Sequence, residues 1–306
     1  MAWYALNRLL LLIPVMLGVS LIAFLMIHLT PGDPARLVAG IEATDADVAR
    51  VRESLGLDQP LYVQYTRFLT NAAQGDLGRS IRTRRPVLDE VLSRYPTTLI
   101  LSTASVVFAV VFGVTAGVLA ATRPYSWLDR VSMIVAILGI SVPSFYLGLL
   151  LLLVFSVQLG WFPMTSRGGF AHFVLPTVTL GLGGAAIIAR LTRSSMLEVL
   201  RQDYVRVAHA KGLAERVVVW RHALKNALIP TVTIVGLQFG TLLGGAVVTE
   251  NVFALPGVGR LVVESILTRD FPIIQAAVLL LAVTFAIVNF AVDLTYAALD
   301  PRIRYG

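Results

Sequence analysis

The chain has 306 residues, of which 57% are apolar and only 14% charged, with a mean hydropathy of +0.78. This composition excludes an ordinary water-soluble domain, and the lack of cysteine excludes disulfides, iron–sulfur clusters and thiolate metal sites. The formal net charge of +7 is compatible with nucleic-acid binding, but cytoplasmic loops of membrane proteins carry the same basic bias. We therefore expect a membrane protein that binds no nucleic acid.

Six apolar segments are long enough to cross a bilayer, whose hydrocarbon core takes about 20 helical residues. They predict an all-α integral membrane protein with spans at Leu9–Leu29, Thr98–Ala121, Val131–Val157, Leu175–Ala189, Thr231–Val248 and Ile273–Tyr296. The first segment is longer than the core of a signal peptide and no small-x-small cleavage site follows it. We expect residues 1–29 to remain as a membrane anchor.

Basic residues predict the orientation of these spans. Thirteen lie in the segments on one side of the membrane and three in the short loops on the other. Because Lys and Arg are enriched in cytoplasmic loops, both termini are predicted to be cytoplasmic, in the plasma (inner) membrane of a bacterium. The basic residues of segment 30–97 are left out of this comparison, because the bias holds only for short loops.

That long segment, 30–97, is predicted to be a small helical insertion outside the membrane. The positions of helix-capping residues, glycines and prolines in this segment indicate three helices. They cover 44–56, with Thr44 as N-cap, 58–75, with Asp58 as N-cap, and 86–96, ending at Tyr95-Pro96. Two readings remain open: a lid that packs on the membrane domain, and a docking platform for an external partner.

The rest of the chain, 98–306, is predicted to be a core of five spans with a polar loop at 190–230. Ser195 and Glu198 have the spacing of a capping box, and Gly212 is a helix stop after Lys211. Apolar residues recur between them at helical spacing, so an amphipathic helix is expected there. A second helical stretch leads to Pro230.

Several strings in the chain are typical of one family. DYVRVAHAKGL, followed by HALKNALIP, resembles the cytoplasmic loop by which permease subunits of bacterial ABC importers engage their ATPases. HLTPGDPARLVAG, VVTENVFALPGVGRL and DLTYAALDPRIRYG agree with it, and LGLDQPLY is similar to permeases of glutathione importers. The resemblance covers essentially the whole chain and points to the dipeptide and oligopeptide permease family.

The resemblance implies that the loop helix couples this chain to an ATPase. The residues it assigns to coupling are Asp203, Tyr204, Val205, Arg206, Ala208, Ala210, Lys211 and Gly212. Tyr204, Val205 and Ala208 are expected to fill a groove on the ATPase. The general importer pattern has Glu and Ala where Arg206 and Val207 stand here, so Asp203 is the candidate to replace that acid. The alternative is a basic helix lying on the bilayer interface.

Two further groups are candidates for the translocation pathway. In the fifth span, small and polar residues indicate either helix packing or the lining of a pore: Gly236, Gln238, Gly240, Thr241 and Gly244. After that span, the resemblance suggests a re-entrant outer gate, although a surface helix fits equally. Its residues are Glu250, Phe253, Pro256 and Gly257.

A separate role is predicted for each of three residues in or beside the spans. Pro143 predicts a kink in the third span, and His28 is expected to be an interfacial or loop-bonding residue rather than a ligand. Asp293 is more consistent with an ion pair to Arg302 or Arg304 than with proton coupling.

Energy for transport has to come from other chains, because the sequence contains no phosphate-binding G-x-x-x-x-G-K-[ST] loop. We expect no bound cofactor or metal, with ATP and Mg on two partner ATPase subunits. A second homologous permease, an extracytoplasmic substrate-binding protein, a short peptide cargo and membrane lipid complete the implied partners. The alternatives are an ion-coupled secondary transporter and an intramembrane enzyme, for which no internal repeat, midplane acid or catalytic motif is evident.

Overall fold

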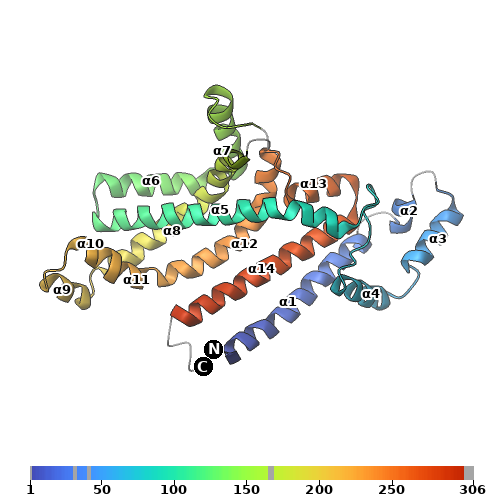
Figure 1. The fold of residues 1–306 in the computed structure, drawn as a ribbon, viewed down its shortest axis with the longest axis horizontal. Helices are drawn as coiled ribbons and strands as arrows, with labels where there is room; N and C mark the ends of the chain where they lie inside the picture. Colours follow the sequence, from blue (N-terminus) through green and yellow to red (C-terminus); the bar gives the residue numbers. More distant parts are fainter. Residues whose placement is uncertain (1, 30–32, 40–42, 165–168, 300–306) are drawn as a thin grey trace. The chain divides into compact units, whose positions relative to one another are not determined.

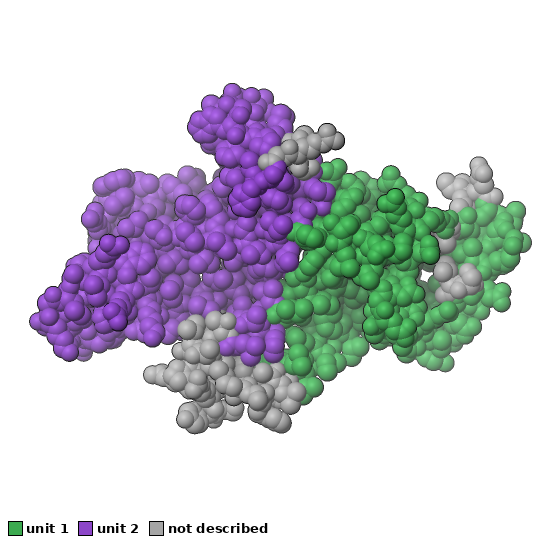
Figure 2. Space-filling view, viewed as in Figure 1, with its two compact units in different colours: residues 1–96, 257–287 green, residues 97–256, 288–306 purple. Residues whose placement is uncertain are grey.

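The computed structural model describes residues 2–29, 33–39, 43–164 and 169–299, and these are helical almost throughout (Figure 1). Arg302 and Arg304, the predicted partners of Asp293, lie outside the described residues. The chain forms two compact units, residues 1–96 with 257–287 and residues 97–256 with 288–306 (Figure 2).

The first unit contains α1 to α4, the start of α5, α13 and most of α14. The helices are α1 (Ala2–Leu29), α2 (Pro34–Ala39), α3 (Asp45–Leu55), α4 (Leu61–Ala73), α5 (Val87–Thr122), α13 (Val258–Thr268) and α14 (Phe271–Leu299). Val87 and Val91 of α5 pack with Val258 and Ile273, so the end of the insertion and the last two helices share one core.

The helix α3 begins as predicted. Thr44 is its N-cap and forms a reciprocal capping box with Asp47, and Gly56 ends it in the left-handed region with φ +67°. Hydrogen bonds from the Thr44 hydroxyl and backbone hold the pKa of the Asp47 carboxyl below its usual range. The prediction for α4 is wrong in one respect, since Pro60 and not Asp58 is its N-cap.

Helix α4 is attached to α1 by polar and aromatic contacts. Tyr65 donates its hydroxyl to the Leu17 carbonyl, 3.1 Å away, and also lies 2.9 Å from the Ser20 hydroxyl. Nearer the end of α1, His28 Nε2 lies 3.0 Å from Gln64 Oε1. His28 therefore bonds the insertion, as expected from the sequence.

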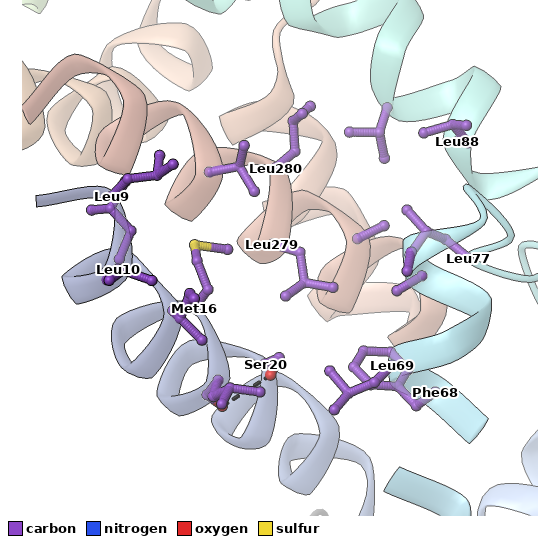
Figure 3. A pocket seen from close by; sticks show the side chains of 18 residues that line it. Leu9, Leu10, Met16, Ser20, Phe68, Leu69, Leu77, Leu88, Leu279 and Leu280 are labelled. Atoms are coloured by element: carbon purple, nitrogen blue, oxygen red, sulfur yellow. Dashed lines mark hydrogen bonds between the residues drawn. The ribbon is translucent and has the colours of Figure 1, made fainter. Parts of the chain in front are cut away.

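An apolar cavity of about 660 Å³ lies between α1, α4 and α14, and Leu88 and Val91 of α5 also line it (Figure 3). Ser20 is the one polar residue in its lining, and its hydroxyl already donates to the Leu17 carbonyl. The lining that the structure describes thus offers a peptide one hydroxyl, which is already hydrogen-bonded, and it fits apolar groups better than peptide groups.

The second unit contains the rest of the helices, with α8 at its centre. They are α6 (Trp127–Ser141), α7 (Ser144–Leu151), η1 (Leu152–Gln158), η2 (Gly169–Phe173), α8 (Val174–Val199), α9 (Asp203–Ala210), α10 (Glu215–Val217), η3 (Val218–Ala223), α11 (Leu224–Ala227) and α12 (Ile229–Val252). Helices α6, α7 and α12 all pack on α8 (Figure 1).

Helices α5 and α8 approach each other through glycine. A Cβ added at Gly113 would lie 2.7 Å from the Ala185 carbonyl oxygen, and one at Gly117 would lie 2.6 Å from that of Ala189. Neither distance is possible for a real side chain, so the two backbones come this close only because both positions lack one.

Three predicted helix boundaries are wrong. Helix α5 runs through Pro96 instead of ending at Tyr95-Pro96, because the packed and apolar residues on both sides of the proline outweigh its local cost. Helix α8 continues to Val199, so Ser195 caps nothing. The third span bends at Pro143, as predicted, but it is divided into two helical segments instead of one kinked helix: α6 and the α7–η1 segment meet at 107°, with Pro143 as the N-cap of α7.

Five helices are long and apolar enough to span a membrane, and the bent α6/α7–η1 pair makes a possible sixth span among the described residues. The segment between α1 and α5 and the segment between α12 and α14 meet, because Ser80 donates its hydroxyl to Asp270. Both segments must therefore lie on the same side of the membrane. That parity holds only if the bent pair also crosses, so we infer six crossings.

Candidate coupling site

The short helix α9 carries the predicted coupling residues. Residues 200–202 turn the chain after α8, and α9 then ends at Lys211 and Gly212. Gly212 has φ +75° and donates its N–H to the His209 carbonyl, 2.9 Å away. Glycine adopts this left-handed conformation without the steric cost of a Cβ, which explains the stop at this position.

One face of α9 is buried inside this chain. Val205 and Ala208 form an apolar cluster with Val218 of η3, and Leu200 packs against it. Val205 is 1% exposed and Ala208 7% exposed. The prediction that these two side chains fill a groove on the ATPase is therefore wrong for this structure; they fix α9 to its own loop instead.

The opposite face of α9 is open. Tyr204 and Val207 are 42% and 52% exposed, and Ala210 and Lys211 are exposed beside them. Tyr204 also accepts a hydrogen bond from Asn226 Nδ2 at 2.8 Å, which ties α9 to α11. Sequence reasoning left Val207 out of the site, although its place in the family pattern, normally Ala, was a signal for it.

The candidate acid Asp203 is exposed at the start of α9. Its Oδ1 lies 3.2 Å from Arg206 Nη1, an exposed pair within one helical turn. Such a pair contributes little to stability. Both charges therefore remain available to a partner surface.

A second apolar cluster connects this loop to the spans. Val219, Ala223 and Leu224 pack with Met196 of α8 and Val118 of α5. Leu200 contacts this cluster as well as the one beneath α9. Close-packed side chains thus connect α9 to α5 and α8.

A buried ion pair, which sequence reasoning missed, joins α6 to α8. Arg193 donates from Nε and Nη2 to the two carboxylate oxygens of Asp129, at 2.6 and 2.7 Å. Asp129 is 3% exposed and also accepts from the Tyr125 N–H at 2.9 Å. A charged residue inside an apolar helix was the available signal, since such residues are paired.

The predicted stripe on α12 is tight at one end and open at the other. A Cβ at Gly236 would lie 2.5 Å from Val292 Cγ1, whereas nothing lies within 4 Å of a Cβ at Gly244. Gly240 is half-buried between them. Thr241 is exposed and donates its hydroxyl to the carbonyl and side-chain oxygens of Gln238. Helix packing accounts for Gly236, and Gly244 has room beside it.

The predicted outer gate begins in the last turn of α12. Glu250 is fully buried and accepts the Thr98 hydroxyl at 2.5 Å, and Phe253 is buried in an apolar cluster with Leu101 and Leu255. Pro256 is the last residue of a segment of the second unit, and Gly257 is the first residue of a segment of the first unit. The helix that follows them is α13, in which Leu261 is buried and Ile266 is exposed.

Two families match the sequence. Residues 113–305 match "Binding-protein-dependent transport system inner membrane component" and residues 1–102 match the N-terminal part of the same kind of membrane component. The glutathione transport system permease proteins GsiC of Escherichia coli strain K12 and of Shigella flexneri serotype 5b are 52% identical over 302 residues, which are 99% of each chain.

A solved inward-facing structure of the MetNI methionine ABC transporter has the same fold. Its TM-score is 0.58 over 69% of this chain and 96% of its own, at 24% identity. In systems of this kind the ATPase is a separate subunit and a substrate-binding protein delivers the cargo. The chain therefore belongs to the family of binding-protein-dependent transport system inner membrane components and is a multi-pass permease subunit of an ABC importer.

Proposed function

We propose that this permease forms half of the pathway by which an ABC importer takes up short peptides, with glutathione as the first cargo to test. The choice of glutathione as cargo is supported by the 52% identity, over nearly the full length, to permeases named for glutathione transport. A second homologous permease forms the other half, and two ATPase subunits and an extracytoplasmic binding protein complete the complex.

The open face of α9 is the surface on which the ATPase acts. Tyr204, Val207, Ala210 and Lys211 are its exposed residues, and Asp203 supplies an acid at its start. The buried face of α9 and the two apolar clusters behind it supply the stiffness that a lever needs. ATP-driven movement of the partner would then reach α5 and α8.

The pathway itself is assigned to α12 and the segment that follows it. The open part of the stripe at Gly240, Thr241 and Gly244 lines the pore, and the segment from Glu250 to Gly257 acts as the outer gate. Gly236 belongs to the packing of α12 against α14, where a side chain has no room.

Purification of the tagged chain with its native partners tests this function. We expect two ATPases, a second permease and a binding protein in the complex, with ATP hydrolysis stimulated by glutathione-loaded binding protein. In proteoliposomes, labelled glutathione should accumulate only with ATP. Ion-driven uptake by the chain alone would refute the importer, whereas uptake of dipeptides without glutathione would replace only the cargo.

A coupling variant with a matched control tests the open face of α9. Val207→Asp places an unpaired charge where an apolar contact is expected. We therefore expect at least a tenfold loss of ATP-dependent uptake and weaker binding of the ATPase. Arg221→Ala alters an exposed residue on η3 instead and should leave both within twofold. Equal effects of the two changes would contradict the assignment.

Orientation can be measured directly because the chain has no cysteine. Cysteine introduced at Lys211 should react with a membrane-impermeant maleimide only in inside-out vesicles, and cysteine at Arg50 only from the outside. The reverse pattern would refute cytoplasmic termini.

A further inference from the structure

The insertion ends in a tight loop, residues 78–86, just before α5. Ser80 donates its N–H to the Arg85 carbonyl at 3.0 Å, and Arg84 donates its N–H back to the Ser80 carbonyl at 3.1 Å. Arg79 and Pro86 form an antiparallel bridge at the base of the loop. The loop therefore has a defined backbone.

A buried carboxylate holds this loop against the junction of α13 and α14. Asp270 is 2% exposed and accepts three hydrogen bonds, from the Ser80 hydroxyl, from the Ile81 N–H at 3.1 Å and from the Arg82 N–H at 3.3 Å. Hydrogen bonds to a buried charge are among the stronger ones in proteins. Two segments almost 190 residues apart thus form one fixed surface.

This surface is rich in arginine. Arg79, Arg82, Arg84 and Arg85 lie within seven residues of the loop, and Arg269 precedes Asp270. The acids nearby are Asp76, Asp89, Glu90 and the buried Asp270. Asp76 accepts the Gly78 N–H, Glu90 accepts the Thr83 hydroxyl, and Asp270 accepts from the loop itself. The side chains of Arg82, Arg85 and Arg269 are exposed, and none forms an ion pair with any residue that the structure describes.

Exposed apolar side chains adjoin these cations. At the end of α13, Leu267 is 80% exposed and Ile266 is 54% exposed, two residues or three before Arg269. Arginine is enriched in protein interfaces, and contiguous exposed apolar surface marks sites of contact with other molecules. The positive-inside bias gives no reason for a cluster of cations on the outer side of the membrane.

We propose that Arg82, Arg85 and Arg269, with Leu267, form a docking surface for an acidic face of the substrate-binding protein. The proposal rests on the proposed function, which places this loop outside the cytoplasm and supplies the partner. Opposite charges on two proteins raise their rate of association and fix their relative orientation. The same surface continues, through Asp270, into α13 and α14, so docking acts directly on the helices that follow the outer gate.

Charge reversal in the intact transporter tests the docking surface. In Arg82→Glu/Arg85→Glu, about tenfold more loaded binding protein should be needed for half-maximal stimulation of ATP hydrolysis. The difference should shrink as salt is raised from about 0.05 to 0.5 M, because salt screens charges on exposed surfaces. Arg82→Lys/Arg85→Lys keeps the charge and should stay within about threefold of wild type.

Arg50→Glu is the matched control, an exposed arginine on α3 of the same insertion. It should leave the half-maximal concentration unchanged. Unchanged stimulation in the glutamate double variant would overturn the docking surface while leaving the importer intact. A wild-type complex that no binding protein stimulates would instead refute the proposed function.

The same arginines can be tested against other anions. In nanodiscs with and without phosphatidylglycerol, the effect of the glutamate double variant should be equal. An effect seen only with phosphatidylglycerol, and without binding protein, would assign the arginines to lipid headgroups and overturn the proposal. A change in cargo affinity of the isolated complex would assign them to the anionic cargo and overturn it too.

Discussion

The candidate coupling helix α9 and the arginine loop at 78–86 are both short segments outside the spans, yet they are held in different ways. Apolar side chains fix α9, through two clusters that share Leu200. A single buried carboxylate, Asp270, fixes the loop. Close-packed apolar contacts transmit a displacement, whereas directed hydrogen bonds hold a backbone in one geometry. Each attachment suits its proposed task, a lever in one case and a docking surface in the other.

The coupling region also contains a buried ion pair, and its removal is expected to have the largest effect on stability. Arg193→Ala leaves Asp129 buried without its cation, which typically costs about 3–5 kcal/mol. The melting temperature of the complex in detergent measures the loss.

If α9 is coupled through apolar packing, the folded fraction of Arg193→Ala should still couple ATP hydrolysis to transport. The double change Asp129→Asn/Arg193→Gln removes both charges and should recover much of the stability. Full folding stability combined with loss of coupling would show that the ion pair, rather than packing, carries the movement.

Leu200→Ala is the most direct test of the apolar connection. It removes the side chain that the two clusters share, so we expect a loss of about 2 kcal/mol in stability and a marked loss of transport per ATP hydrolysed. Leu237→Ala on an exposed face of α12 is the control, and it should change neither quantity. If Leu200→Ala transported as much per ATP hydrolysed as the wild type, the proposed role of apolar packing in fixing α9 would be contradicted.

Ser80→Ala probes the other attachment. It removes one donor to Asp270 and the acceptor of the Thr83 N–H, which should cost about 1–2 kcal/mol locally. Hydrogen exchange should speed up at residues 80–83 and remain unchanged in α9. Faster exchange in both segments would indicate that the two attachments are not independent.

Gly212→Ala should have the smallest effect. No atom lies within 4 Å of the added Cβ, so the cost comes only from φ +75° and amounts to about 1 kcal/mol. Hydrogen exchange at Lys211 to Leu213 should rise slightly. A cost of several kcal/mol would mean that the turn after α9 carries more of the coupling site than its open surroundings suggest.

Local sequence signals worked where neighbours were few. The Thr44 cap, the Gly56 and Gly212 stops and the bonding role of His28 all follow from residues close in sequence or from their chemistry. The same kind of signal failed at Ser195 and Tyr95-Pro96, where long apolar helices continue through it. Tertiary packing there outweighs a preference of about 1–3 kcal/mol.

The sequence predicted where the candidate coupling helix lies in the chain, but not which of its side chains face outward. The sequence pattern located α9 and its turn, but it could not tell that Val205 and Ala208 face inward onto Val218. On a short amphipathic helix with apolar residues around most of its circumference, only the neighbouring η3 segment decides which face is covered. Asp129 with Arg193, and Asp270 with Ser80, were missed because their partners are distant in sequence.

The sequence by itself determined that this protein is an all-α membrane permease, because hydropathy, basic residues and family strings are properties of single segments. Only the tertiary structure decided how sharply the third span bends at Pro143, that the segment before α5 meets the junction of α13 and α14, and which residues of α9 remain open. The physical reason is that these features depend on contacts between distant segments, whose free energy no local pattern contains.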